Sequence, residues 1–274
     1  MVAVLGHPIA HTASPVMHNA AFDALGLNWR YLAFDVHPNH LRDVLRGLAA
    51  TGMAGVNLTL PHKILAMRYL SSAEKSVVQL GNANTLQFSM MSHQPVIRGY
   101  NTDGHGLLMA LDEEFSFRPR DKTVAIIGCG GAGRSAAIQL ALAGAKKLIL
   151  LNRTRSKALA TARRILALKI RTTCVFAPEK CDLVIQATSL GLKNSDPLPV
   201  SYRDFERLGA VFYFDMVYRP AITSMIRAAG KTGCRTAGGL GMLLHQGARA
   251  FEIWTGRRAP IKVMRCALEK EVYG

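Results

Sequence analysis

Side chains that can form hydrogen bonds or transfer protons gather at predicted strand ends and turns in the N-terminal part of the chain. The stretches AHTAS, NLTLPHK, GNANT and NTDG supply Thr12, Ser14, Asn57, Thr59, Lys63, Asn84, Asn101, Thr102 and Asp103. Strand carboxyl ends face a common cleft in α/β sheets, so we expect these groups to converge there. The set suits a small polyhydroxylated anion, because each substrate hydroxyl needs a hydrogen-bonding partner.

Each of these residue types also has a purely structural explanation. Ser14 stands before a proline, an arrangement typical of a helix N-cap. Asn84 and Asn101 suit turns, and Asp103 before a glycine suits the cap of the next helix. Lys63 alone is compatible with an ordinary surface lysine. Nine histidines are present without an accompanying carboxylate cluster, so we expect no metal site.

A glycine-rich segment, GCGGAG at 128–133, lies between a predicted strand and a predicted helix. In that context the GxGxxG spacing predicts a dinucleotide site. Gly128 would allow the tight turn, Gly130 would let a pyrophosphate approach the backbone, and Gly133 would let the helix pack closely. The expected cofactor-binding loop is therefore Gly128, Cys129, Gly130, Gly131, Ala132 and Gly133. A ligand-free turn and a methyltransferase cofactor loop are the alternatives.

The segment NRTRSK at 152–157 follows the next predicted strand and offers cations where NAD-binding folds place an acid. An acid would accept hydrogen bonds from a ribose diol and would repel a 2′-phosphate. A guanidinium can instead hold a phosphate through two parallel hydrogen bonds. We therefore expect NADP as the cofactor, with contributions from Asn152, Arg153, Thr154, Arg155 and Lys157. The alternative is a solvated basic start of a helix.

The composition favours a globular protein that binds small anions. Of the 274 residues, 49% are hydrophobic, and the formal net charge is +16. The cations are spread along the chain without a basic tail, which argues against nucleic acid as a partner. Five cysteines with no CxxC pair fit a reducing cytoplasm. No apolar run reaches the ~18–20 residues of a membrane span, and the opening stretch is expected to be a buried strand rather than a signal peptide.

Alternation of apolar strands with helical patterns predicts an α/β fold with a doubly wound, mostly parallel sheet in the second half. Strands are expected at 2–5, 30–36, 55–60, 123–128, 146–152, 173–176, 182–187 and 210–215, with a hairpin over 85–100. Helices are expected at 15–25, 39–49, 104–114, 133–144, 241–254 and 260–271, and two short ones over 62–80.

The chain resembles the shikimate dehydrogenase family over nearly its whole length. The matching segments, in the family's order, are GHPIAHTASPVMHNAAF, GVNLTLPHK, GNANTL, GYNTDGHGL, IIGCGGAGR, LNRT, ATSLG, FDMVY and GGLGMLLHQGA. The resemblance implies reversible reduction of 3-dehydroshikimate to shikimate with NADPH, in aromatic amino-acid biosynthesis. It also implies a substrate domain at 1–104, completed by 240–274, and a Rossmann-type NADP domain at 105–239. A monomer or homodimer is expected.

The resemblance also assigns roles to individual residues. Lys63 corresponds to the family's catalytic lysine and Asp103 to its partner. Thr12 and Ser14 match the positions that hold the substrate carboxylate. Further substrate contacts fall on Thr59, Asn84, Tyr218 and Gln246, and cofactor contacts fall on Thr188, Ser189, Met216 and Gly239.

Four positions depart from the family's usual residues. Thr12 replaces a serine, Gln186 an asparagine, and Gly238 and Lys75 stand where acids are common. None of these changes removes a catalytic group, but they leave substrate breadth open. The alternatives are a quinate/shikimate dehydrogenase and a non-catalytic NADP-binding sensor on the same scaffold.

Overall fold

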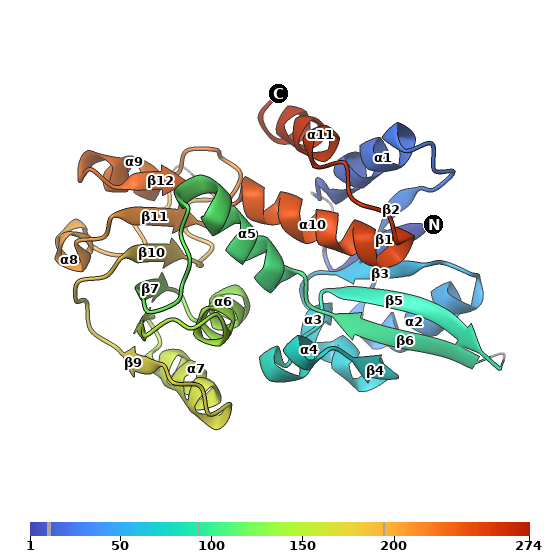
Figure 1. Ribbon diagram of the computed structural model, residues 1–274, viewed down its shortest axis with the longest axis horizontal. Coiled ribbons are helices and arrows are strands. Elements are labelled where there is room, and N and C mark those ends of the chain that lie inside the picture. Colours follow the sequence, from blue (N-terminus) through green and yellow to red (C-terminus); the bar gives the residue numbers. More distant parts are fainter. Residues whose placement is uncertain (10–11, 93, 194) are drawn as a thin grey trace. The chain divides into compact units, whose positions relative to one another are not determined.

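The computed structural model describes residues 1–9, 12–92, 94–193 and 195–274 (Figure 1). The chain forms two compact units. One contains residues 1–106 and 243–272 with Gly274, and the other contains residues 107–242 with Tyr273. Both are built from helices and a mainly parallel sheet, which confirms the α/β fold class.

The first unit contains a six-stranded mixed sheet in the order β2-β1-β3-β5-β6-β4. Its strands are β1 (Val2–Gly6), β2 (Tyr31–Asp35), β3 (Gly55–Leu58), β4 (Ser72–Ala73), β5 (Thr85–Met91) and β6 (Gln94–Tyr100). The first three are parallel, whereas β5 and β6 form the expected antiparallel hairpin. The two-residue β4 is too short to show a periodic pattern, and the sequence did not predict it.

Among the described residues, seven helical elements lie wholly or mostly in this unit. They are α1 (Ser14–Ala24), η1 (Pro38–His40), α2 (Leu41–Ala50), α3 (His62–Leu65), η2 (Ala66–Tyr69), α4 (Lys75–Leu80) and α11 (Ile261–Tyr273). Two more, α5 (Asp103–Phe115) and α10 (Leu240–Thr255), begin in one unit and end in the other.

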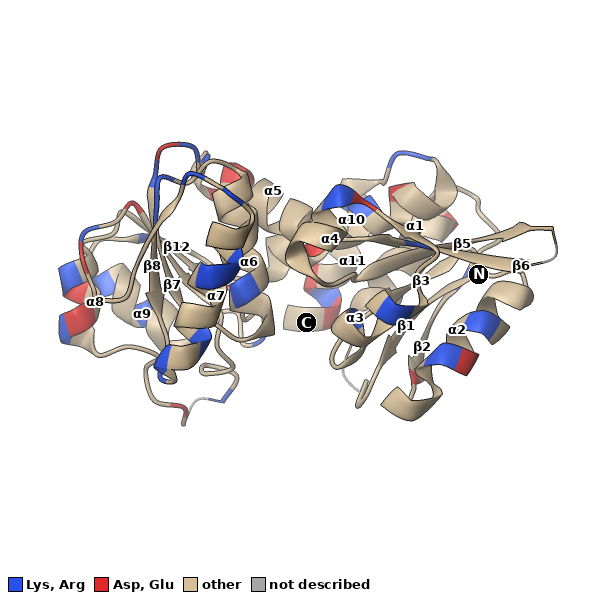
Figure 2. Ribbon diagram, turned by 90° about the horizontal axis from the view of Figure 1, so that it is seen from below, with Lys and Arg blue, Asp and Glu red and all other residues tan. Residues whose placement is uncertain are grey.

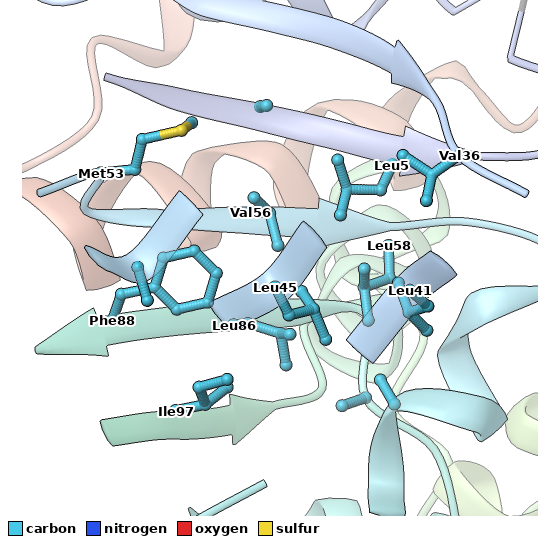
Figure 3. Packing of buried hydrophobic residues seen from close by; sticks show 14 of the residues in the cluster. Leu5, Val36, Leu41, Leu45, Met53, Val56, Leu58, Leu86, Phe88 and Ile97 are labelled. Atoms are coloured by element: carbon cyan, nitrogen blue, oxygen red, sulfur yellow. The ribbon is translucent and has the colours of Figure 1, made fainter. Parts of the chain in front are cut away.

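The main core of the first unit lies between α2 and one face of the sheet. Leu41 and Leu45, one helical turn apart on α2, are fully buried. Figure 3 shows them beside Leu58 and Leu86 of the sheet. Burying each such side chain contributes about 1.5–3 kcal/mol. This packing fixes the positions of the strands, and the carboxyl ends of those strands carry the candidate site.

An aromatic cluster in the same unit encloses His18 of α1. The ring stacks on Tyr31, with centroids 4.4 Å apart and planes 4° apart, and it also lies near Phe251 and Trp254 of α10. Neither ring nitrogen has a hydrogen-bonding partner among the described residues. Burial lowers the pKa of His18 to about 3, from an ordinary value of 6.5.

We expect His18 to make stability fall in mild acid. Between pH 6.5 and about 3 the unfolded chain takes up a proton that the folded chain refuses. Stability is therefore complete above pH 6.5 and declines as the pH falls, by ~1.4 kcal/mol per pH unit. His18→Phe keeps a stacking ring without this titration. The free energy of unfolding, measured by urea denaturation, should fall between about pH 7 and about pH 5 by ~2 kcal/mol more in wild type than in the variant. Equal losses would contradict the assignment.

The second unit contains a fully parallel sheet in the order β12-β11-β10-β7-β8-β9. Its strands are β7 (Thr123–Ile127), β8 (Lys147–Leu151), β9 (Thr173–Val175), β10 (Leu183–Gln186), β11 (Phe212–Asp215) and β12 (Arg235–Ala237). Its helices are α6 (Gly131–Leu142), α7 (Arg155–Ala167), α8 (Tyr202–Leu208) and α9 (Ser224–Lys231). The chain winds outward in both directions from β7 and β10, which confirms the predicted doubly wound arrangement.

Within the described ranges, every helix is too short or too polar to cross a membrane.

Candidate functional site

Lys63 and Asp103 form the ionic centre of the first unit's site. Lys63 lies in α3 and Asp103 is the first residue of α5. Lys63 Nζ donates to Asp103 Oδ2 at 2.6 Å, and the side chains keep 27% and 19% of their surface exposed. Position at a helix N-terminus favours the negative charge of Asp103. The pair is thus ordered by the fold and still accessible to a ligand.

Asn84 connects this pair to the surrounding backbone. Its Nδ2 donates to the second oxygen of Asp103 at 2.9 Å, and its Oδ1 accepts from the backbone N–H of Thr102 at 2.7 Å. Gln246 Oε1, from α10, lies 3.4 Å from the same Nδ2. The structure therefore brings together four predicted residues that are far apart in the sequence.

The capping alternative for Asp103 is wrong, because another side chain has that role. Asn101 Oδ1 accepts from the backbone N–H of Gly104 at 3.2 Å, at the start of α5. Ser14 is not an N-cap either, since α1 begins at Ser14 itself, after Ala13, and has no side-chain cap. Neither side chain is therefore occupied by a helix cap.

A buried tyrosine that has no signal in the sequence is bonded to a predicted substrate residue. Tyr31 Oη donates to Asn57 Oδ1 at 2.7 Å. Burial raises the pKa of Tyr31, and a hydrogen bond from Ser14 partly offsets that rise. Asn57 Nδ2 donates to the carbonyl oxygen of Asn84 at 3.1 Å and to Thr85 Oγ1 at 2.9 Å. A hydrogen-bonded chain therefore runs from Tyr31 through Asn57 and Asn84 to the ionic pair.

The two predicted threonines, Thr12 and Thr59, contact other parts of the same unit. Thr12 is half-buried and its Oγ1 accepts from the backbone N–H of Ser14 at 3.3 Å. Thr59 follows β3, and its backbone N–H donates to Leu5 at 2.9 Å. Its methyl group packs where a side chain on Gly6 would stand. Lys75, one of the departures, is exposed at the start of α4.

In the second unit, the glycine-rich loop has the shape that a phosphate cradle requires. Gly128 adopts a φ of 98°, which favours glycine. A Cβ on Gly133 would overlap the carbonyl oxygen of Gly128, whereas Gly130 and Gly131 have open space above them. The helix begins at Gly131, two residues earlier than expected. Three motif residues therefore form its first turn, where unpaired N–H groups attract phosphate.

Asn152 ties this loop to the end of β8. Its Oδ1 accepts from the backbone N–H of Cys129 at 2.8 Å, and its Nδ2 donates to the carbonyl oxygen of Thr154 at 2.8 Å. Burial raises the pKa of the Cys129 thiol to about 11. The thiol is therefore neutral at physiological pH, so Cys129 offers the cradle only its backbone.

Arg153, Arg155 and Lys157 are exposed next to the loop. None of the ion pairs between described residues includes them, and the first turn of α7 carries no acid. Figure 2 shows the basic segments along α7. These groups fit a phosphate on the ribose, and the described residues place no acid there to hold a ribose diol.

The remaining predicted cofactor residues follow β10, β11 and β12. Thr188 lies against Gly128, and Gly239 packs so closely on Met216 that a Cβ would overlap its carbonyl group. Ser189 is next to Thr188 in the same loop. Tyr218, predicted to contact substrate, is half-buried in this unit, and burial raises its pKa.

The chain matches three family descriptions in succession. Residues 4–86 match the shikimate dehydrogenase substrate binding domain, residues 111–193 the shikimate/quinate 5-dehydrogenase family, and residues 239–269 the shikimate 5′-dehydrogenase C-terminal domain. Shikimate dehydrogenase (NADP(+)) of Moorella thermoacetica is 42% identical, over 96% of this chain and 90% of that protein.

Solved structures give the same result. A crystal structure of a shikimate dehydrogenase in complex with NADP+ has a TM-score of 0.87 and 36% identity, covering 100% of this chain and 96% of that one. The enzyme from Thermus thermophilus, in complex with NADP(H) and shikimate, has a TM-score of 0.86 and 33% identity, with 98% of each chain covered. The chain therefore belongs to the shikimate dehydrogenase family.

Proposed function

We propose that the chain is an NADP-dependent shikimate dehydrogenase, which reversibly reduces 3-dehydroshikimate to shikimate. The observation that carries the proposal is the Lys63–Asp103 pair at 2.6 Å, partly exposed at the strand ends of the first unit. NADPH, when bound, supplies the hydride that protein side chains cannot. The proton and the stabilisation of charge on the ketone oxygen must come from the chain.

Lys63 is the proton donor of this pair. Asp103 already accepts hydrogen bonds from Lys63 and Asn84, one on each oxygen. It therefore acts as an acceptor that orients the ammonium and can bind a substrate hydroxyl. Lys63 then donates to the ketone oxygen and offsets its developing negative charge. In the reverse direction the amine accepts the proton from the alcohol.

The hydroxyls of Thr12 and Ser14 would hold the substrate carboxylate, and the amides of Asn84 and Gln246 the ring hydroxyls. Asn57, Thr59 and Tyr218 complete the proposed substrate contacts. NADP would lie on the loop 128–133, with its 2′-phosphate on Arg153 and its neighbours. Met216 and Gly239 would line the nicotinamide pocket, and Thr188 and Ser189 would lie near the bound face of the cofactor.

We also propose that the chain works in the cytoplasm on small metabolites. The five cysteines are unpaired, which fits a reducing cytoplasm. The dispersed cations and the small-anion site support metabolite rather than nucleic-acid partners, with the chain acting as a monomer or homodimer.

A substrate comparison tests the proposal against its near alternative. We expect kcat/KM to be higher for shikimate than for quinate, and higher with NADP than with NAD. Quinate has one more hydroxyl, which the pocket must accommodate beside the extra methyl of Thr12. Equal or better turnover of quinate would replace the proposal with a quinate/shikimate dehydrogenase.

Tyr31 provides a more specific prediction about the substrate site. Tyr31→Phe removes the hydroxyl that donates to Asn57. KM for shikimate should rise about five- to tenfold, because the Asn57 side chain loses a fixed orientation. KM for NADP should stay unchanged.

Tyr100→Phe is the matched control for this change. It removes a tyrosine hydrogen bond of similar length, the part-buried one of 2.9 Å to Gln87, from the same sheet. It should leave KM for shikimate unaltered. A Tyr31→Phe variant that binds shikimate no worse than this control would contradict the role given to Tyr31.

A further inference from the structure

The loops after β10 and β11 adjoin the point where the second unit's sheet changes winding direction. β7 and β10 are neighbours, and open α/β sheets bind ligands at such a point. Loop 187–191 follows β10, and its Thr188 packs against Gly128 of the glycine-rich loop. Loop 216–223 follows β11. The positions of these two loops therefore bear directly on cofactor binding.

Asp215 ends β11 as a fully buried carboxylate. Its Oδ1 accepts from Val217 N at 3.0 Å and Gln186 Nε2 at 3.3 Å, and its Oδ2 from Thr223 Oγ1 at 2.8 Å and Tyr213 Oη at 3.2 Å. Burial raises the pKa of Asp215, and three of these donors partly offset the rise. Two of the four donors belong to loop 216–223, so the carboxylate fastens both ends of that loop.

Gln186 extends the same network to the other loop. It is fully buried at the end of β10. Its Oε1 accepts from the backbone N–H of Thr188, and its Nε2 donates to the carbonyl oxygen of Leu190 at 2.8 Å as well as to Asp215. One amide therefore fixes loop 187–191 and joins it to the carboxylate.

Loop 216–223 is also held from its other side. The backbone N–H of Gly239 donates to the carbonyl oxygen of Val217 at 3.1 Å, and the Gly239 Cα lies against the Met216 backbone. The Thr223 hydroxyl that donates to Asp215 accepts from the backbone N–H of Ile226 at 3.1 Å, and so caps α9. Met216 is thus fixed between the carboxylate and Gly239.

We propose that Asp215 and Gln186 form one positioning unit that holds loops 187–191 and 216–223 in the geometry that NADPH requires. The proposal rests on the proposed function, which places Thr188, Ser189 and Met216 on the cofactor. Asp215 and Gln186 act through those residues and make no contact with the reacting atoms. They govern cofactor affinity, and among the proposed substrate contacts they act only on Tyr218, which lies in loop 216–223.

Two volume-preserving variants of the full chain test this proposal. Gln186→Met removes the amide, and Asp215→Asn converts one acceptor oxygen into a donor. Each should raise the Kd for NADPH about tenfold in a fluorescence titration, because buried backbone groups lose their partners. The double variant should bind NADPH about as tightly as the single variant that binds it more weakly. The effects of two substitutions within one hydrogen-bonded network are not additive.

Phe205→Leu is the control for a general loss of stability. Phe205 is buried in the same core and its ring lies 5.8 Å from that of Tyr213. The Phe205→Leu variant should have a lower Tm than wild type and an unchanged Kd for NADPH, measured well below that Tm. Unchanged Kd values in both network variants, or an equal rise in Phe205→Leu, would overturn the proposal.

The titration also separates this proposal from the proposed function. If wild type binds NADPH but fails to reduce 3-dehydroshikimate, the proposed function is wrong, and a raised Kd in the variants still supports the positioning unit. If wild type is active and the variants bind NADPH normally, only the positioning unit is wrong.

Discussion

Replacing Lys63 with alanine should lower kcat for 3-dehydroshikimate reduction by ~10²–10⁴-fold, the usual contribution of a positioned proton donor. The variant removes the ammonium that lies 2.6 Å from Asp103 and leaves the second unit's loops intact. NADPH should therefore bind with unchanged Kd. Steady-state absorbance of NADPH gives kcat, and a fluorescence titration gives Kd.

Lys147→Ala is the matched control for Lys63→Ala. Lys147 forms a 2.7 Å ion pair with Glu179 in the second unit, with similar exposure of the lysine side chain. Losing that pair should leave kcat near the wild-type value, since exposed ion pairs contribute ~0–1 kcal/mol to stability. A Lys63→Ala variant whose kcat remains within about threefold of wild type would remove Lys63 from the chemistry.

The second large effect concerns cofactor choice. Arg153→Ala should raise KM for NADP about tenfold to a hundredfold, because a charge-assisted hydrogen bond is worth ~1.5–3 kcal/mol. KM for NAD should change little, since NAD lacks the 2′-phosphate. The measurement is KM for both cofactors at saturating shikimate.

Arg203→Ala provides the control for net charge. Arg203 is exposed on α8, a different helix of the same unit, so its loss changes the protein's field without touching the proposed phosphate site. It should affect both cofactors equally and weakly. Similar losses for NADP and NAD in Arg153→Ala would show that the arginine does not recognise the phosphate.

The features that the sequence predicted are those with a local signal. The strand, the glycine spacing and the following helix identify the loop 128–133 within one segment. The alternation after residue 123 likewise predicted a parallel sheet, and the order β12-β11-β10-β7-β8-β9 confirms it. Polar residues at strand ends were sufficient to nominate Lys63, Asn84 and Asp103 as neighbours.

The buried hydrogen bonds behind both sites could not be predicted where they join segments that are far apart in the sequence. Tyr31 begins a strand and reads as an ordinary core residue, and its bond to Asn57 arises only when β2, β1 and β3 align. Asp215 reads as the last residue of an apolar strand. Three of its four donors are near it in the sequence, but the bond to Gln186 arises only when β10 and β11 pair. The helix start at Gly131 was misjudged because glycine has low intrinsic helix propensity.

One assay tests the central claim most directly. Purified chain is mixed with NADP, and absorbance of NADPH is followed before and after shikimate is added. The account predicts no change before the addition and a sustained rise afterwards, which disappears in Lys63→Ala. No rise with shikimate, from a chain that still binds NADPH, would contradict the account and favour a non-catalytic NADP-binding sensor.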